Sequence, residues 1–289
     1  MNELVNKVIE SIQCLLPEVE VSTQQISKNN DVVKTGVILK SKDNNLAPVF
    51  YIDDLIVEDW SAEDIASYIY KSYLENEIKD YKNLINIISD FEKISDLLTV
   101  QIVNRTLNQS ALIDVPFVPF LGDLASVVLV DLEKGNCVSA TIKVTKQLLE
   151  IWGMTFEKVY SVAYANLIKE KPVMFSMEEL LSVLGYQEAK ELDSNMYVLT
   201  NESRIHGATM MLRESLFKEL TERFRSDLIV IPSSLHEVLL VPIENSFDAY
   251  KEQFDEIVRE VNRTQLDPVE ILADHIYLYR RNGGWCDFN

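Results

Sequence analysis

The chain has 289 residues, of which 47% are hydrophobic, so it can fold around a sizeable core as one large domain or two moderate ones. Its 46 acidic residues outnumber its 27 basic residues and leave a formal net charge of -19. A field of this sign repels nucleic-acid phosphates and anionic lipid headgroups, so the composition argues against nucleic acid or a membrane surface as the partner.

The first ninety residues predict helices around a small antiparallel meander. A helix opens the chain and ends at Pro17, which lacks the amide proton that the next helical hydrogen bond needs. Turn-prone KNND and KDNN clusters then separate three extended segments, VEVSTQQIS, VKTGVILKS and APVFYIDDL. Ser61 and Asp64 resemble a capping box before a helix that runs to about residue 75. A second helix is expected to carry one apolar stripe, formed by Leu84, Ile87, Ile88, Phe91, Ile94 and Leu98.

Two prolines mark the expected boundary between two halves of the chain. TVQIVNRTLNQ and SALIDVPFVPF are typical of strands or extended connections, and Pro116 and Pro119 limit a role in the centre of a sheet. We therefore place the boundary at 116–122 and expect domains at 1–120 and 121–289. Next, LASVVLVDLEKGNCVSATIKVT predicts a hairpin, because two β-branched runs flank a glycine-containing turn at 133–136.

The second half predicts blocks of helices and strands. Helices are expected at 146–153, 156–170 and 177–184, the last behind a capping box of Ser176 and Glu179. MYVLT predicts a strand, 208–225 a helical run, DLIVIPSSLHEVLLVP two strands, and SFDAYKEQFDEIVREVN a long helix capped by Asn245. Asp267 is placed to cap a short helix before a final strand, HIYLYRR. This order favours an α+β fold with antiparallel sheets and segregated helices, in two halves of similar size.

The turn between the two strands of DLIVIPSSLHEVLLVP holds the most chemistry-bearing residue types. In a strand, His236 and Glu237 point to opposite faces, so they do not form a dyad unless the strand bulges. Ser234 and His236 can share a face, which is the minimum for an activated nucleophile, but an orienting acid and an oxyanion hole are also needed. The alternative is that Ser233 and Ser234 bond backbone groups in the turn while His236 caps the sheet edge.

Two further histidines lie at expected strand ends. His206 follows MYVLT, and Asp274 with His275 precedes the last strand. If the histidines converge, a metal site or an acid/base cluster becomes possible, whereas a structural role is the ordinary outcome for each. The catalytic candidates are therefore Ser234, His236, Asp274 and His275.

The sequence does not contain the motifs that are characteristic of most nucleotide-binding and hydrolase folds. The sequence lacks the GxxxxGK[ST], GxGxxG, HExxH and GxSxG patterns. The three cysteines, Cys14, Cys137 and Cys286, lie far apart, are odd in number and form no CxxC pair, so they indicate neither a disulfide framework nor a zinc knuckle. The first segment carries Glu3 and Glu10 within its apolar pattern, unlike a signal peptide, and no run approaches the roughly 18 apolar residues of a membrane span. We expect a cytoplasmic protein without a metal or cofactor.

Several segments together resemble a bacterial family of uncharacterised proteins, domain-of-unknown-function family 5688. They are ISKNNDVVKTGVIL, NLAPVFYIDDL, WGMTFEKVYSVAYANL, MYVLTNESRIHGA, IPSSLHEVLLVP, EIVREVNRT and ADHIYLY. The positions that match best are Asn201, Gly207, Ala208, Pro232, Ser233, Ser234, His236, Glu237, Asp274 and His275. The family pattern does not require a histidine at His206, which puts a three-histidine site in doubt. From the Val159 helix onward the order is also similar, more faintly, to the YtpQ-like proteins. The resemblance implies a bacterial origin and an accessory role near mobile-element genes, but no reaction.

Three functional hypotheses follow. The first is a non-enzymatic binding or regulatory protein that presents its second half to a protein partner, with Asn201, Gly207, Ser233 and Glu237 as binding residues; a homo-oligomer is possible. The second is a hydrolase or metal-dependent enzyme that uses the Ser234, His236, Asp274 and His275 cluster, so whether the chain is an enzyme stays open. The third is an acidic inhibitor with a nucleic-acid-like charge surface.

Overall fold

A computed structural model of the chain describes residues 2–41, 47–75, 81–132, 141–179, 195–243 and 247–286. The chain forms two compact units: Met1–Lys28 with Val32–Asp90, and Asn29–Asp31 with Phe91–Asn289. The sheets in both units are antiparallel throughout and the helices lie outside them, which confirms the α+β fold with antiparallel sheets. This division differs from the expected halves, because the 116–122 stretch forms a strand and a turn inside a sheet of the second unit.

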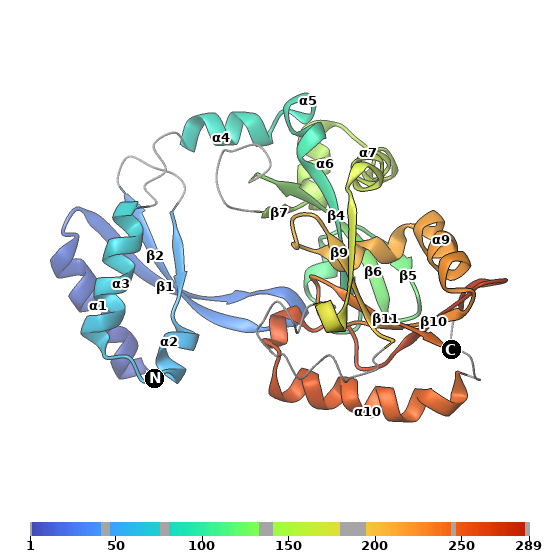
Figure 1. The fold of residues 1–289 in the computed structure, drawn as a ribbon. Helices are drawn as coiled ribbons and strands as arrows, with labels where there is room; N and C mark the ends of the chain where they lie inside the picture. The colour runs from blue at the N-terminus through green and yellow to red at the C-terminus, as the bar shows by residue number, and fades with distance from the viewer. Residues whose placement is uncertain are drawn as a thin grey trace. The chain divides into compact units, whose positions relative to one another are not determined.

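The first unit is a three-stranded meander covered by helices (Figure 1). Its elements are α1 (Asn2–Leu15), β1 (Val19–Ser27), β2 (Val33–Ser41), β3 (Val49–Tyr51), α2 (Asp53–Val57), α3 (Ala62–Glu75) and α4 (Tyr81–Ile88). Strand β1 pairs with β2 along its whole length, from Val19 opposite Ser41 to Ser27 opposite Val33, as the turn clusters predict. The helices α1 and α3 contribute Val8, Ile12 and Ile65 to a core that β2 completes with Val37 and Leu39.

Ser61 caps α3 as predicted, but the Asp64 carboxylate accepts the Ser61 hydroxyl and not the Ser61 backbone N–H of a full capping box. Asp64 N donates to Ser61 Oγ at 3.1 Å, and the Ser61 hydroxyl donates back to the Asp64 carboxylate at 2.6 Å. The single helix expected through Leu98 is wrong, however. Helix α4 ends at Ile88, α5 (Phe91–Ile94) and the 3-10 turn η2 (Ser95–Leu97) follow, and Leu98 already begins a strand. The interruption falls at Ser89 and Asp90, residue types whose side chains compete for backbone hydrogen bonds.

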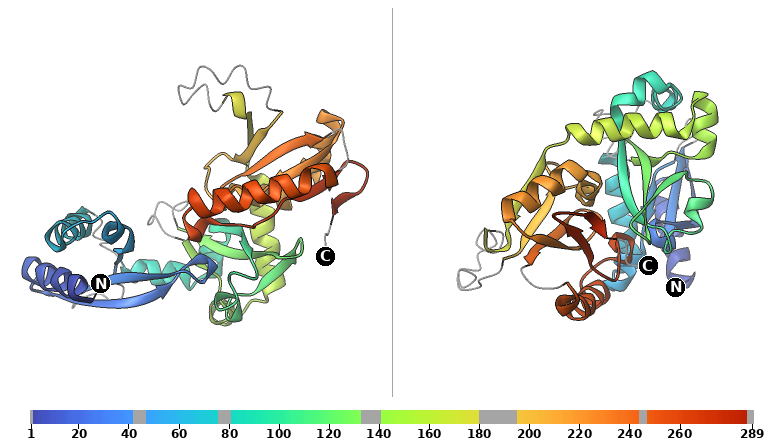
Figure 2. Two further views of the ribbon diagram at one scale, coloured as in Figure 1. Left: turned by 90° about the horizontal axis from the view of Figure 1, so that it is seen from below. Right: turned by 90° about the vertical axis from the view of Figure 1, so that its right-hand side faces the viewer.

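The second unit contains a four-stranded and a six-stranded sheet (Figure 2). In the smaller sheet β6 (Leu124–Asp131) pairs with β4 (Leu98–Asn104), β5 (Phe117–Phe120) and β7 (Thr141–Lys143). The β6 and β7 pair is the predicted hairpin, whose turn lies outside the described residues. The larger sheet has the order β13-β12-β10-β11-β9-β8. Its strands are β8 (Pro172–Ser176), β9 (Tyr197–Asn201), β10 (Asp227–Ile231), β11 (Val238–Ile243), β12 (Tyr277–Arg280) and β13 (Gly284–Cys286).

Helices of the second unit cover these sheets (Figures 1 and 2). Helices α6 (Lys146–Trp152) and α7 (Phe156–Lys169) begin at the caps Thr145 and Thr155, and α7 packs on β4 and β6. The 3-10 helix η5 (Gly207–Leu212) and α9 (Glu214–Phe224) form the predicted helical run, and α10 (Asp248–Thr264) covers one face of the larger sheet. The 3-10 turns η1 (Asn29–Asp31), η3 (Ala111–Ile113) and η6 (Pro268–Glu270) complete the unit.

The caps predicted in the second half have different outcomes. Asp267 accepts a hydrogen bond from Val269 N at 3.1 Å and caps η6 as expected, whereas Asn245 lies outside the described residues. Ser176 and Glu179 form their capping box, but most of the helix expected behind it lies outside the described residues. At the C-terminal end of the described residues, Gly284–Cys286 pairs with β12 as β13. Each helix in the described part of the chain is too short or too polar to cross a bilayer.

Candidate functional site

The loop that follows β9, residues 201–207, is held against the turn that follows β10. Thr200 Oγ1 donates to His236 O at 2.7 Å, and Ala208 N donates to Leu235 O at 3.2 Å. Between these two contacts, His206 N donates to the His236 ring at Nδ1, at 3.2 Å. The first two contacts therefore fix the ends of the loop, and the His236 ring holds the loop at His206.

Gly207 is required by the closeness of these two segments. A Cβ atom at this position would lie 2.1 Å from Thr200 Oγ1, 2.3 Å from His236 O and 2.9 Å from Asn201 N. Two of these three atoms belong to the backbone and cannot turn away. Glycine is the residue that permits such an approach of two backbones.

The same loop has an unusual backbone. Arg204 and His206 both adopt left-handed conformations, with φ of 56° and 53°. For residues other than glycine this conformation costs about 1–2 kcal/mol each. The loop tolerates it because Asn201, which is buried, bonds back across it: Asn201 Nδ2 donates to Ile205 O at 2.9 Å, and Ser203 Oγ donates to Asn201 Oδ1 at 3.1 Å.

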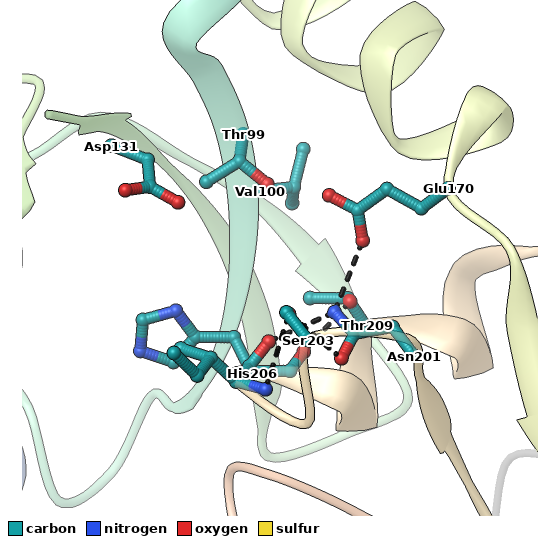
Figure 3. A pocket seen from close by; sticks show the side chains of 9 residues that line it. Thr99, Val100, Asp131, Glu170, Asn201, Ser203, His206 and Thr209 are labelled. Carbon is teal, nitrogen blue, oxygen red and sulfur yellow. Dashed lines mark hydrogen bonds between the residues drawn. The ribbon is translucent and has the colours of Figure 1, made fainter. Parts of the chain in front are cut away.

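A cavity of about 320 Å³ opens beside the loop, within the second unit (Figure 3). It lies among β4, β6, the end of α7, β9 and η5, and its lining residues are Thr99, Val100, Asp131, Glu170, Asn201, Ser203, Ile205, His206 and Thr209. This set contains two carboxylates and no lysine or arginine. A second hollow of about 330 Å³ shares Glu170, Asn201 and Ser203, and adds Lys171 and Glu202, which lie 3.8 Å apart as an ion pair.

The polar groups of the cavity are positioned by specific bonds. Asn201 Nδ2 also donates to Glu170 Oε2 at 3.1 Å, and the Glu170 carbonyl accepts a hydrogen bond from Arg213 Nη1 at 2.6 Å. Thr209 Oγ1 donates to His206 O at 2.8 Å. The glutamate is thus tied to β9 on one side and to the residue before α9 on the other. A concave site with a few fixed polar groups is the usual form of a binding site.

His236 takes a structural position. Its Nδ1 accepts a hydrogen bond from His206 N, so the neutral ring carries its proton on Nε2, which lies 3.6 Å from Glu270 Oε1. Ser234 is buried, and its hydroxyl oxygen accepts the His236 N–H at 3.0 Å. Among the described residues the His236 ring makes no hydrogen bond to Ser234, Glu237 or Asp274. The arrangement that the hydrolase hypothesis requires is therefore not assembled around this ring.

His275 belongs to a different polar group. Its Nε2 lies 3.5 Å from Asp123 Oδ1, and the same carboxylate oxygen accepts the Tyr277 hydroxyl at 2.8 Å. Burial raises the pKa of Tyr277 far above its ordinary value of 10.0, and the neighbouring Asp123 charge raises it further. Asp274 instead accepts a hydrogen bond from Asn262 Nδ2 at 2.9 Å. The predicted catalytic residues are thus distributed over separate clusters.

The three histidines do not form a common metal site in the described part of the chain. His206 and His236 stack with ring centroids 5.8 Å apart and an angle of 11° between the planes, whereas His275 packs on Tyr277. No three His, Cys, Asp or Glu side chains among the described residues are arranged to hold a metal ion.

The predicted binding residues are related to the loop in different ways. Asn201 lines the cavity, and Gly207 permits the close approach of the loop and the neighbouring turn. Ser233 and Glu237 lie in that turn, partly exposed and outside the set that lines the cavity.

Sequence reasoning missed most of the cavity. Thr99, Asp131 and Glu170 come from β4, β6 and the end of α7, segments that it interpreted only as sheet and helix. The one available signal was the pair of polar residues, Asn201 and Ser203, directly after the apolar MYVLT strand.

The comparisons with known proteins bring a family but no activity. No curated protein and no solved structure matches the chain, and the fainter likeness to YtpQ-like proteins stays a prediction. One family model, described as a family of unknown function, matches residues 1–281, which include the loop, the cavity and the histidine turn. The chain therefore belongs to the family of unknown function DUF5688.

Proposed function

We propose that the chain is a non-enzymatic protein-binding or regulatory protein, and that it contacts its partner through the 201–207 loop and the cavity beside it. The observation that carries this proposal is that the potentially reactive groups at the site are engaged in structural hydrogen bonds. The hydroxyls of Ser203 and Ser234 and the Nδ1 atom of His236 all take part in hydrogen bonds that shape the loop and the turn. A general base at His236 would have to release the His206 amide before it accepted a proton at Nδ1.

The outer part of the loop supports a contact role. Ile205 is 42% exposed and lines the cavity, and Arg204 beside it is also exposed. An exposed apolar residue at the edge of a polar cavity, on a backbone that several hydrogen bonds hold in place, suits recognition with little loss of loop entropy on binding. An accessory role near mobile-element genes and a cytoplasmic location are compatible with this proposal and stay predictions.

Site-specific photocrosslinking in the cells from which the gene comes tests the proposal. A photoreactive phenylalanine analogue replaces Ile205 in one variant and Val57, which is 85% exposed in the first unit, in a control variant. We expect a discrete protein to be captured from position 205 and not from position 57. Capture of the same proteins at both positions, or of none at position 205, would contradict the proposal.

A further inference from the structure

We propose that the cavity beside the 201–207 loop binds the guanidinium group of an arginine side chain presented by the protein partner. This inference rests on the proposed function and adds to it the chemistry of the bound group.

The charge of the cavity selects a cation. Asp131 and Glu170 lie on either side of Thr99 in the cavity (Figure 3). The described residues that line the cavity include two carboxylates and no lysine or arginine, and the chain carries a net charge of -19, so the field of these residues and the overall field have the same sign. Low-dielectric walls concentrate such a field and favour an incoming positive group.

A second observation, independent of the carboxylates, also points to a ligand. Thr99 is only 6% exposed, and its hydroxyl has no hydrogen-bond partner among the described residues. Figure 3 shows this hydroxyl within the cavity, on the side of Glu170. Because this hydroxyl is not among the fully buried atoms that lack a partner, water can reach it, and a bound donor that enters the cavity would take the place of that water.

The shape of the cavity favours arginine over lysine. Asp131, Thr99 and Glu170 present acceptor oxygens at separated positions around the cavity, and a guanidinium presents five N–H donors in one plane, which can reach separated acceptors. An ammonium directs its three donors from a single strongly hydrated nitrogen. The volume of about 320 Å³ is at the small end for ligand sites, which suits one long side chain. Val100 and Ile205 can cover its methylene stem.

Calorimetric titration with three blocked amino acids tests the inference. N-acetyl-arginine methylamide carries the proposed group, the lysine analogue keeps the charge, and the citrulline analogue keeps the shape without the charge. For a single side chain we expect a dissociation constant on the order of 1 mM for arginine, and at least about tenfold weaker binding for citrulline. Lysine should bind more weakly than arginine. Equal binding of citrulline and arginine, or of lysine and arginine, would overturn the assignment of a guanidinium.

Variants locate the binding. Glu170→Gln and Asp131→Asn each remove one carboxylate charge and should weaken arginine binding about tenfold or more. Thr99→Val keeps the side-chain shape and should weaken it about threefold to tenfold. Glu150→Gln, on the exposed face of α6 in the same unit, is the matched control and should leave it unchanged. If Glu170→Gln and Glu150→Gln bind arginine alike, the inference fails. Photocrosslinking at position 205 can still succeed in that case, so the two failures are distinguishable.

Discussion

Replacement of Gly207 by alanine is the sharpest test of how the loop is built. The new methyl group would lie 2.1 Å from Thr200 Oγ1 and 2.3 Å from His236 O, far inside ordinary van der Waals contact. The backbones of the loop and the turn must therefore separate, at a cost of about 1–3 kcal/mol for overpacking. Weakening of the Thr200 to His236 hydrogen bond adds about 1 kcal/mol. We expect the free energy of unfolding of the second unit to fall by about 2–4 kcal/mol.

Gly153→Ala is the control for this substitution. Gly153, unlike Gly207, adopts the left-handed conformation, with φ of 62°, but a Cβ atom there meets nothing within 4 Å. Its expected cost is the backbone term alone, about 1 kcal/mol. Thermal unfolding followed by circular dichroism should show a decrease in Tm of about 5–15 °C for Gly207→Ala and a clearly smaller one for Gly153→Ala. Equal decreases for the two variants would refute the close approach of loop and turn.

Three further predictions concern other parts of the chain. His236→Phe leaves the His206 amide without its acceptor, so the free energy of unfolding in urea should fall by about 1–3 kcal/mol. Hydrogen exchange at the His206 amide should accelerate, and unchanged exchange would contradict its bond to the His236 ring. The raised pKa of Tyr277 means that the folded state resists ionisation of this phenol. The phenol's contribution to stability is therefore complete below pH 10 and is lost as the pH rises further. Tyr277→Phe should lessen the loss of stability at alkaline pH, and an identical pH profile of stability for the two proteins would refute this. Asp53→Asn should destabilise the first unit by about 1–2 kcal/mol, because the Asp53 carboxylate accepts the N–H and the hydroxyl of Thr35, and a urea transition that does not shift would contradict it.

The local structure of the chain was readable from the sequence because it depends on short-range chemistry. The bounds of β1 and β2 follow from the apolar runs and the KNND turn cluster, and the Ser61 N-cap follows from its spacing to Asp64. The break after α4 was missed because a continuous apolar stripe concealed the Ser89 and Asp90 pair.

Long-range contacts account for what the sequence did not reveal. The Trp285 ring near the end of the chain packs against Phe217 in α9 and Tyr279 in β12, with ring centroids 4.7 Å and 5.1 Å away. The cavity likewise joins Thr99 in β4 to Asn201 at the end of β9, about a hundred residues apart. A pattern within one segment carries no information on such pairings, so the candidate site could be predicted only at Asn201 and Gly207, where the family resemblance pointed.

The most direct test of the account is a nuclear magnetic resonance titration of the isotope-labelled protein with N-acetyl-arginine methylamide. We predict that the resonance changes are concentrated at Thr99, Asn201 and His206, and that the ligand is recovered chemically unchanged. Changes confined to other parts of the second unit, or conversion of the ligand to a product, would contradict a site that works by contact alone.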